Sequence, residues 1–278
     1  MRATRRWKAL LRHRLGLLGA VLVAALLATA AGAPLVARTD PLGMHMTDAL
    51  QPPSAAHWFG TDQFGRDEWS RVVYGARLSF LVGLLSMLLA TAAGLPIGAA
   101  AGFLGGPFDA MAMRAMDAIL GFPAILLAIG LVTSLGPGTA SGVIAIGVVY
   151  VPVVARVVRG AVLARRREEY VDAARALGRT DWGILWRHVL PNSVAPILVQ
   201  VTVGFASAIV IEAGLSFLGA GTPPPTPEWG SMLNEARQFM VAAPFTAIFP
   251  GVAISLAVLG FNLLGDGMRD VLDPRLPR

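Results

Sequence analysis

Residue types that commonly carry catalysis or bind metals are scarce in this chain of 278 residues. The chain has no cysteine, so it can form no disulfide framework, Cys-ligated zinc site, iron–sulfur cluster or thiol nucleophile. Its only lysine is Lys8, in the N-terminal tail, whereas a P-loop needs a lysine beside its glycine-rich turn. The chain therefore lacks the residues of an ATPase.

Two further motifs fall short of a reactive site. GLSFLG at 214–219 has Leu218 where a Gly-x-Ser-x-Gly nucleophile elbow requires glycine, and none of the four histidines lies in a predicted span. Met44, His45 and Met46 offer soft metal ligands, but three adjacent residues cannot all face one ion on a regular element. We predict no catalytic residue, no cofactor and no metal site in this chain.

The most regular charge pattern lies at residues 170–192, YVDAARALGRTDWGILWRHVLPN. On a helix of 3.6 residues per turn, charged side chains at spacings of three and four form one polar stripe. The stripe consists of Glu168, Asp172, Arg175 and Arg179. The opposite face consists of Tyr170, Ala173, Ala174 and Leu177. Gly178 is predicted to end this helix as its C-cap.

A second short helix is predicted to follow, capped by Thr180 or Asp181 and ended by Pro191. The first helix carries small residues that would let another surface approach its backbone closely: Ala173, Ala174 and Gly178. The pattern fits either an amphipathic helix lying on lipid or a helix that docks in a groove of a cytoplasmic partner.

The composition is typical of a membrane protein, because 55% of the residues are hydrophobic and only 14% are charged. Crossing a bilayer takes about 20 apolar residues of helix. Runs that satisfy this length lie at about 15–37, 78–104, 118–135, 140–160, 194–217 and 246–265. We therefore predict an all-α polytopic protein with about six transmembrane helices. The run at 78–104 is rich in glycine and alanine and is predicted to pack in the interior.

Lysine and arginine set the expected orientation, because they favour the cytoplasmic side of a membrane. The side with both termini and residues 170–192 would hold 18 of these residues, against 5 on the other side. The basic residues sit at the ends of apolar runs, which argues against a nucleic-acid partner despite the net charge of +6. The predicted organisation has five parts: a cytoplasmic tail at 1–14, a first span at 15–37, an extracytoplasmic loop at 38–77, a transmembrane core at 78–265, and a cytoplasmic tail at 266–278. The core includes a cytoplasmic loop at 165–192.

The outer side has two features of its own. A short interfacial helix is predicted at 67–76, with Trp69 and Tyr74 at the depth of the lipid headgroups. Glu212, near the outer end of a span, either reaches back to the outer interface or lines the mouth of a translocation pathway.

Residues 170–192 resemble the EAA loop of permease subunits of ABC importers. The spacing of that motif is matched by Asp172-Ala173-Ala174, Gly178 and Leu190-Pro191. Two residues depart from it: Asp172 replaces the glutamate of the motif, and His188 replaces a residue that is commonly aliphatic. The segments 57–80, 108–129, 212–233 and 262–275 resemble the C-type permease of dipeptide, oligopeptide and nickel importers. The resemblance covers most of the chain from residue 57 onward.

The resemblance implies the architecture of an ABC type I importer permease in a bacterial inner membrane. The loop would be a coupling helix in a groove of the ATPase, with Tyr170, Asp172, Ala173, Ala174, Leu177, Gly178, Leu190 and Pro191 at the contact. ATP and Mg would be bound by one or two partner ATPase subunits. The other implied partners are a second homologous permease in a heterodimer, an extracytoplasmic substrate-binding protein and membrane lipid.

The resemblance makes dipeptides or short oligopeptides the expected substrates, with nickel or another small solute as the alternative. An ion-coupled secondary transporter is a further alternative. It would more commonly show internal repeats or ionisable residues in mid-span, whereas only Glu212 and Asp266 approach the membrane here.

Overall fold

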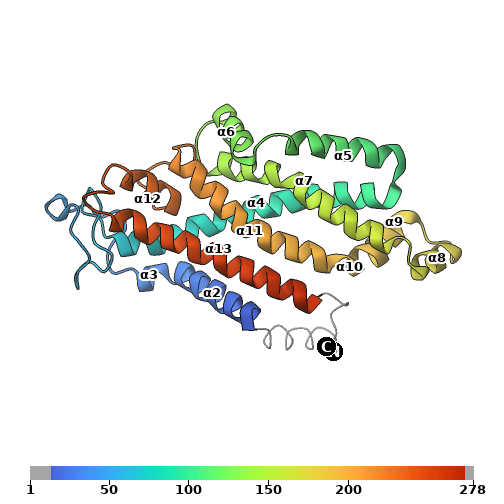
Figure 1. The fold of residues 1–278 in the computed structure, drawn as a ribbon, viewed down its shortest axis with the longest axis horizontal. Coiled ribbons are helices and arrows are strands. Elements are labelled where there is room, and N and C mark those ends of the chain that lie inside the picture. The colour runs from blue at the N-terminus through green and yellow to red at the C-terminus, as the bar shows by residue number, and fades with distance from the viewer. Residues whose placement is uncertain (1–13, 273–278) are drawn as a thin grey trace.

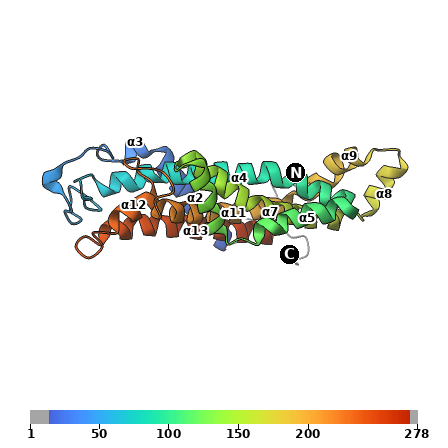
Figure 2. The same cartoon turned by 90° about the horizontal axis from the view of Figure 1, so that it is seen from above.

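The computed structural model describes residues 14–272, and the regular elements in this range are all helices (Figure 1). Five helices are long and apolar enough to cross a membrane: α2 (Arg14–Ala31), α4 (Glu68–Leu104), α7 (Thr139–Arg165), α11 (Val194–Phe217) and α13 (Phe245–Leu272). They lie along one common axis, so the molecule is elongated (Figures 1 and 2). Apart from Arg14, the predicted tail at 1–14 lies outside the described residues, as do residues 273–278 of the predicted C-terminal tail.

A sixth candidate span is broken into α5 (Gly106–Leu120) and α6 (Ala124–Leu135), which meet at 87°. The sequence placed one continuous helix at 118–135, and this prediction was wrong. Pro123 stands at the N-cap of α6 with ψ of 128°, which is not helical. Proline has no backbone N–H to continue a helix and disfavours the helical conformation of the residue before it, so the chain turns here.

Helix α4 is a single helix of 37 residues, and the separate interfacial helix predicted at 67–76 is its first part. Asp67 begins the helix by accepting a hydrogen bond from the Ser70 backbone N–H at 2.9 Å. At 1.5 Å per residue such a helix is about 55 Å long, whereas the hydrocarbon core of a bilayer is about 30 Å thick. Helix α4 is therefore longer than a crossing of the hydrocarbon requires.

Glycines let α4 and α7 pack backbone against backbone. A Cβ atom on Gly94 would lie 2.7 Å from the Val151 carbonyl oxygen, and one on Gly98 would come still closer to the carbonyl oxygen of Ala155. This contact confirms the predicted interior packing of the run at 78–104. Small residues matter at such contacts because they bring the backbones, and hence more atoms, within van der Waals range.

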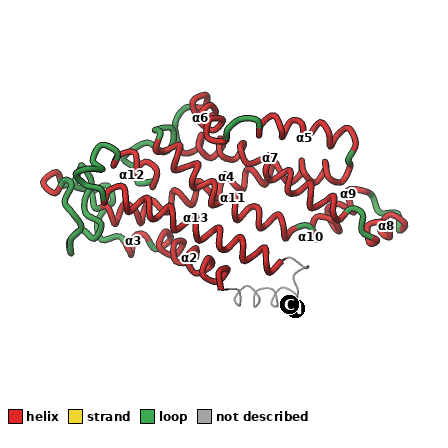
Figure 3. Tube along the Cα trace, viewed as in Figure 1, coloured by secondary structure: helices red, strands yellow, loops and turns green. Residues whose placement is uncertain are grey.

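The two ends of the bundle differ in structure. At one end lie the segment 37–67 and α12 (Trp229–Ala236), and Figure 3 shows that irregular backbone gathers there. This segment includes the 3-10 turn η1 (Met46–Asp48) and follows the short helix α3 (Ala33–Val36). At the other end the loop after α7 projects from the bundle (Figure 2).

Candidate functional site

The candidate site is the helical loop that joins α7 to α11 at one extreme end of the molecule (Figure 1). It consists of α8 (Glu169–Ala176), α9 (Asp181–Ile184), the π-helical turn η2 (Leu185–Val189) and α10 (Leu190–Asn192). The two short helices predicted for this stretch are therefore present, as α8 and α9.

Apolar side chains anchor the loop to the bundle. Val171 and Ala174 of α8 are buried, and so are the last residue of α9 and three residues that follow it. These are Ile184, and then Leu185, Val189 and Leu190. Burying one such aliphatic side chain stabilises the fold by about 1.5–3 kcal/mol, so the loop is held as part of the core.

The predicted apolar face of the first helix is divided between two sides. Ala174 is buried and Tyr170 half-buried, whereas Ala173 and Leu177 face outward, Leu177 with 84% of its surface exposed. The four positions fit one helical stripe about 100° wide, but the bundle covers only the edge that carries Ala174. The expectation that both Ala173 and Ala174 would be open to an approaching surface was therefore wrong for Ala174.

Two tryptophans extend the outward apolar surface. Trp182 is 55% exposed and Trp186 is 48% exposed, four residues apart. Exposed aromatic side chains are typical of a contact surface for another protein or for lipid. These tryptophans were not among the predicted site residues, although two tryptophans spaced by about one helical turn in a loop between spans were a usable signal.

Gly178 ends α8 as predicted. Its φ is +75°, and the Gly178 N–H donates to the Arg175 carbonyl while the Arg179 N–H donates to the Ala174 carbonyl. This pair of hydrogen bonds is the Schellman arrangement, in which glycine is favoured because a side chain strains the left-handed backbone. A Cβ atom on Gly178 would meet nothing within 4 Å in this chain, so the residue is open to an approaching surface.

The second helix begins at Thr180, whose side-chain oxygen accepts a hydrogen bond from the Gly183 N–H at 3.3 Å. Pro191 does not end this helix, contrary to the prediction, because η2 runs directly into α10. A π-helical turn has wider, i to i+5 hydrogen bonding, and proline is tolerated in the first turn of the helix that follows. Ser193 does not cap α11, since its hydroxyl donates to the Val189 carbonyl at 2.9 Å.

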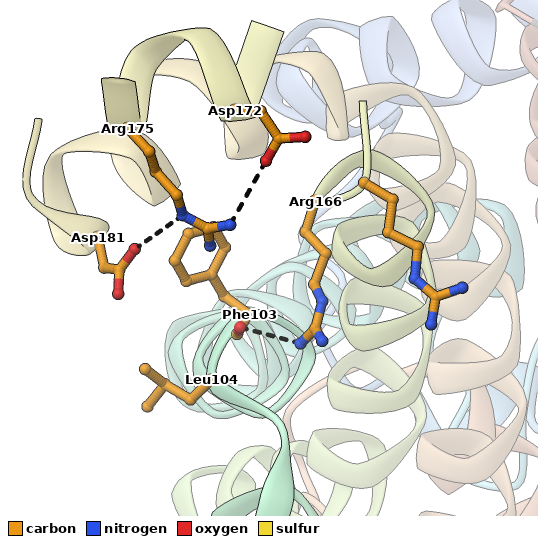
Figure 4. Close-up of a pocket in the computed structure, with 7 residues that line it drawn as sticks. Phe103, Leu104, Arg166, Asp172, Arg175 and Asp181 are labelled. Carbon is orange, nitrogen blue, oxygen red and sulfur yellow. Dashed lines mark hydrogen bonds and ion pairs between the residues drawn. The ribbon is translucent and has the colours of Figure 1, made fainter. Parts of the chain in front are cut away.

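The inner side of the loop faces a polar cavity of about 410 Å³ between α8 and the ends of α4 and α7 (Figure 4). Arg175 lies between two carboxylates there, 3.7 Å from Asp172 and 3.4 Å from Asp181 (Figure 4). These groups are half exposed or more, so each ion pair contributes less than about 1 kcal/mol. Asp172 therefore has its ion-pair partner, Arg175, within its own chain.

Arg166 fixes the end of α4 against α7. Its guanidinium donates to the carbonyl oxygens of Gly102 at 3.1 Å and Phe103 at 3.0 Å (Figure 4). A cation is favourable at the carboxyl end of a helix, where carbonyl groups lack partners. For Tyr170, burial, followed by the Glu168 carboxylate, raises the pKa of the phenol. The Tyr170 side chain therefore remains neutral at physiological pH.

A second polar cluster, at the opposite end, was missed by the sequence analysis. Arg66 and Arg71 are buried and both donate to Oε2 of Glu235, at 2.7 and 2.8 Å. Asp62 accepts from Arg66 at 2.5 Å. The cluster joins the segment before α4 to α12, more than 160 residues later, which no local pattern could indicate.

Glu212 lies at this same end, in α11, with 3% of its surface exposed. It does not extend to the interface, so that alternative was wrong. Ser216 donates to its Oε1 at 3.3 Å.

Among residues 14–272, no group of three or more His, Cys, Asp or Glu side chains is arranged to hold a metal ion.

These features define a class: a multi-span helical membrane protein with an anchored helical loop at one end and a polar, ordered cap at the other. Residues 94–278 match the family described as "Binding-protein-dependent transport system inner membrane component". Residues 3–53 match the "N-terminal TM domain of oligopeptide transport permease C". The chain belongs to the first of these families and is an inner-membrane component of an ABC importer.

Relatives with established names resemble the chain over nearly its whole length. It is 46% identical over 270 residues to the dipeptide transport system permease protein DppC of Alkalihalophilus pseudofirmus, covering 97% of this chain and 89% of that one. It is 44% identical over 271 residues to the glutathione transport system permease protein GsiD of Pectobacterium atrosepticum, covering 97% and 90%. The fold also resembles that of the MetNI methionine ABC transporter in an inward-facing conformation, with a TM-score of 0.62 and 18% identity, covering 73% of this chain and 96% of that one.

Proposed function

We propose that this chain is the permease subunit of an ATP-driven importer of dipeptides or short oligopeptides, and that the loop at 165–192 receives the force of ATP hydrolysis. The observation that carries the proposal is the two-sided loop: one side is buried in the core and the other exposes Ala173, Leu177, Gly178 and two tryptophans. Because the loop is anchored in this way, a displacement of its exposed side would also move α7 and α11.

The ATPase would be a separate cytoplasmic protein, present in one or two copies and holding ATP and Mg. This chain would catalyse no reaction and bind no cofactor. Its part would be alternating access: closure of the ATPases moves the loop, and the spans reorient around a pathway formed with a second homologous permease. A substrate-binding protein would deliver the cargo to the end that carries α12.

The docking surface follows from the exposure of each candidate residue. Ala173, Leu177, Gly178 and Pro191 are exposed and would touch the ATPase directly. Ala174 and Leu190 are buried, so they would act by holding the loop in place. Asp172 would orient Arg175, and half-buried Tyr170 would fill the space beneath α8.

The peptide substrate rests on the relatives, which are named for dipeptide and glutathione transport. Glutathione is itself a short peptide, so the named cargoes share one chemical class. Nickel was the alternative, and the relatives reported above do not favour it. Glu212 is proposed to support the outer mouth of the pathway from a buried position rather than by contacting the cargo.

A labelling experiment tests the docking surface. Because the chain has no native cysteine, a thiol reagent would react only with the introduced cysteine. Ala173→Cys and Ala174→Cys are adjacent, identical changes on the outer and inner sides of α8. A thiol reagent should label Ala173→Cys in the isolated permease and should react several-fold more slowly once the ATPase is bound. Ala174→Cys should react poorly in both states. Equal labelling of Ala173→Cys with and without the ATPase would contradict docking at this surface.

Reconstitution tests the energy source and the cargo. Proteoliposomes that hold the complete assembly should take up peptide only with ATP, and vesicles with this chain alone should take up none under an ion gradient. Mass spectrometry of the ligand that co-purifies with the binding protein should identify a peptide. Uptake by the chain alone would mean an ion-coupled carrier, and a bound metal ion would replace the peptide proposal.

A further inference from the structure

Two buried carboxyl groups meet between α11 and α12. Glu212 of α11 is 3% exposed and Glu228, which precedes α12, is 0% exposed. Their carboxyl groups lie within hydrogen-bonding reach of each other. Two carboxylates can only accept hydrogen bonds, so a contact between them is repulsive unless one of the pair carries a proton.

Glu228 has the hydrogen-bonding environment of an anion. Its Oε1 accepts from the Gly230 N–H at 2.6 Å and from the Ser79 hydroxyl at 3.3 Å, and its Oε2 accepts from the Ser231 N–H at 2.8 Å. It also stands at the N-terminus of α12, where a negative charge is favoured. A carboxylate has about four acceptor positions, and these three donors leave one position unfilled.

Glu212 has the environment of a neutral acid. Its Oε1 accepts from the Ser216 hydroxyl at 3.3 Å. Oε2 is buried and has no partner among the donors of the described residues. An O–H at this position would donate to the unfilled position of the Glu228 carboxylate.

Among residues 14–272, no cationic side chain forms an ion pair with Glu212 or Glu228 that would balance a second negative charge. Arg71 of α4 is bound to Glu235, and Arg77 of α4 is exposed and lies over Tyr74. Helix α6 contains no charged residue, and those of α7 and α13 stand in the halves of these helices nearer the other end of the molecule. Glu228 is the charged group that faces Glu212.

We propose that Glu212 and Glu228 form a proton-binding site, in which the proton resides on Oε2 of Glu212 and is donated to the Glu228 carboxylate. This shared proton holds the start of α12 on α11. The same turn is held on α4 by Trp229, whose indole N–H donates to the Val72 carbonyl at 2.9 Å. The outer helix α12 is therefore fixed to two spans. The inference depends neither on the substrate nor on the ATPase partner proposed above.

The proposal predicts opposite responses to the same chemical change at the two positions. In Glu212→Gln the amide NH₂ replaces the donating O–H and its carbonyl still accepts from Ser216, so the thermal midpoint of the purified assembly should stay close to that of the wild type. In Glu228→Gln an NH₂ group replaces an oxygen that accepts from a backbone N–H, so the midpoint should fall by several degrees. The reverse order, or an equal effect, would overturn the assignment of the proton.

Infrared spectroscopy of the assembly detects the proton directly. The carbonyl stretch of a protonated carboxylic acid should be present in the wild type and absent from Glu212→Gln at neutral pH, so it should appear in the difference between the two spectra. Glu169→Gln, at an exposed carboxylate, is the matched control and should leave that band unchanged. A wild-type-minus-Glu212→Gln spectrum without this band would show that both groups are ionised, and the proposal would fail.

Discussion

Gly178 and Gly219 end helices at opposite ends of the molecule with the same hydrogen-bond pattern. Gly219 has φ of +79°, its N–H donates to the Ser216 carbonyl, and the Ala220 N–H donates to the Leu215 carbonyl. A Cβ atom at either glycine would meet nothing within 4 Å. The two glycines have the same surroundings within the chain, but the ATPase is proposed to dock only at Gly178. Gly219 is therefore a control for Gly178.

The first prediction compares Gly178→Asn with Gly219→Asn. Asparagine tolerates the left-handed backbone, so each change should cost the fold about 1 kcal/mol or less. Gly178→Asn should nevertheless reduce co-purification of the ATPase and peptide uptake several-fold, because it adds a side chain to the proposed docking surface. Gly219→Asn should leave ATPase binding unchanged. Full ATPase binding and uptake in Gly178→Asn would remove the docking role of this turn.

At the scale of elements, the packing of α4 on α7 determines how closely the spans approach. Gly98 faces the Ala155 carbonyl, whereas Gly160 of α7 faces open space. Gly98→Ala should lower the free energy of unfolding by about 1–3 kcal/mol, because the helices must separate. Gly160→Ala should raise it by about 0.5–1 kcal/mol through helix propensity. Thermal or denaturant unfolding in detergent measures both, and an equal response would contradict this packing.

The polar cluster at the end that carries α12 supports a second prediction at this scale. Glu235→Gln removes the carboxylate that joins Arg66 to Arg71, and both guanidinium groups are buried. Breaking a buried ion pair on one side costs about 3–5 kcal/mol, so the variant should unfold at a clearly lower temperature. Glu169→Gln, at an exposed site, should change stability little. A small effect at Glu235 would mean that water already screens the cluster.

At the scale of the whole molecule, the two ends are predicted to lie on opposite sides of the membrane. Val241 follows α12 and is fully exposed, and Leu177 is exposed at the loop end. In cells that make the permease without its ATPase, a membrane-impermeant thiol reagent should label Val241→Cys once the outer barrier is permeabilised, and Leu177→Cys only after the inner membrane is also opened. Labelling in the reverse order would invert the orientation expected from the lysine and arginine distribution.

Much of this protein is determined locally by its sequence. The long spans follow from apolar run length, because unsatisfied backbone groups in lipid force each run to be a helix. The end of α8 at Gly178 and the start of α9 at Thr180 follow from backbone conformation and capping, which involve only near neighbours. For the same reason the loop at 170–192 could be recognised before its structure was known.

The tertiary structure decided what depends on distant residues. It divided Ala173 from Ala174, since the direction of burial depends on where the bundle lies and not on helix periodicity alone. It joined Arg66 and Arg71 to Glu235, and brought Glu212 against Glu228 across a loop. Long-range contacts of this kind form when chain segments converge in the packed fold, so their partners and their burial are properties of the fold rather than of any local pattern.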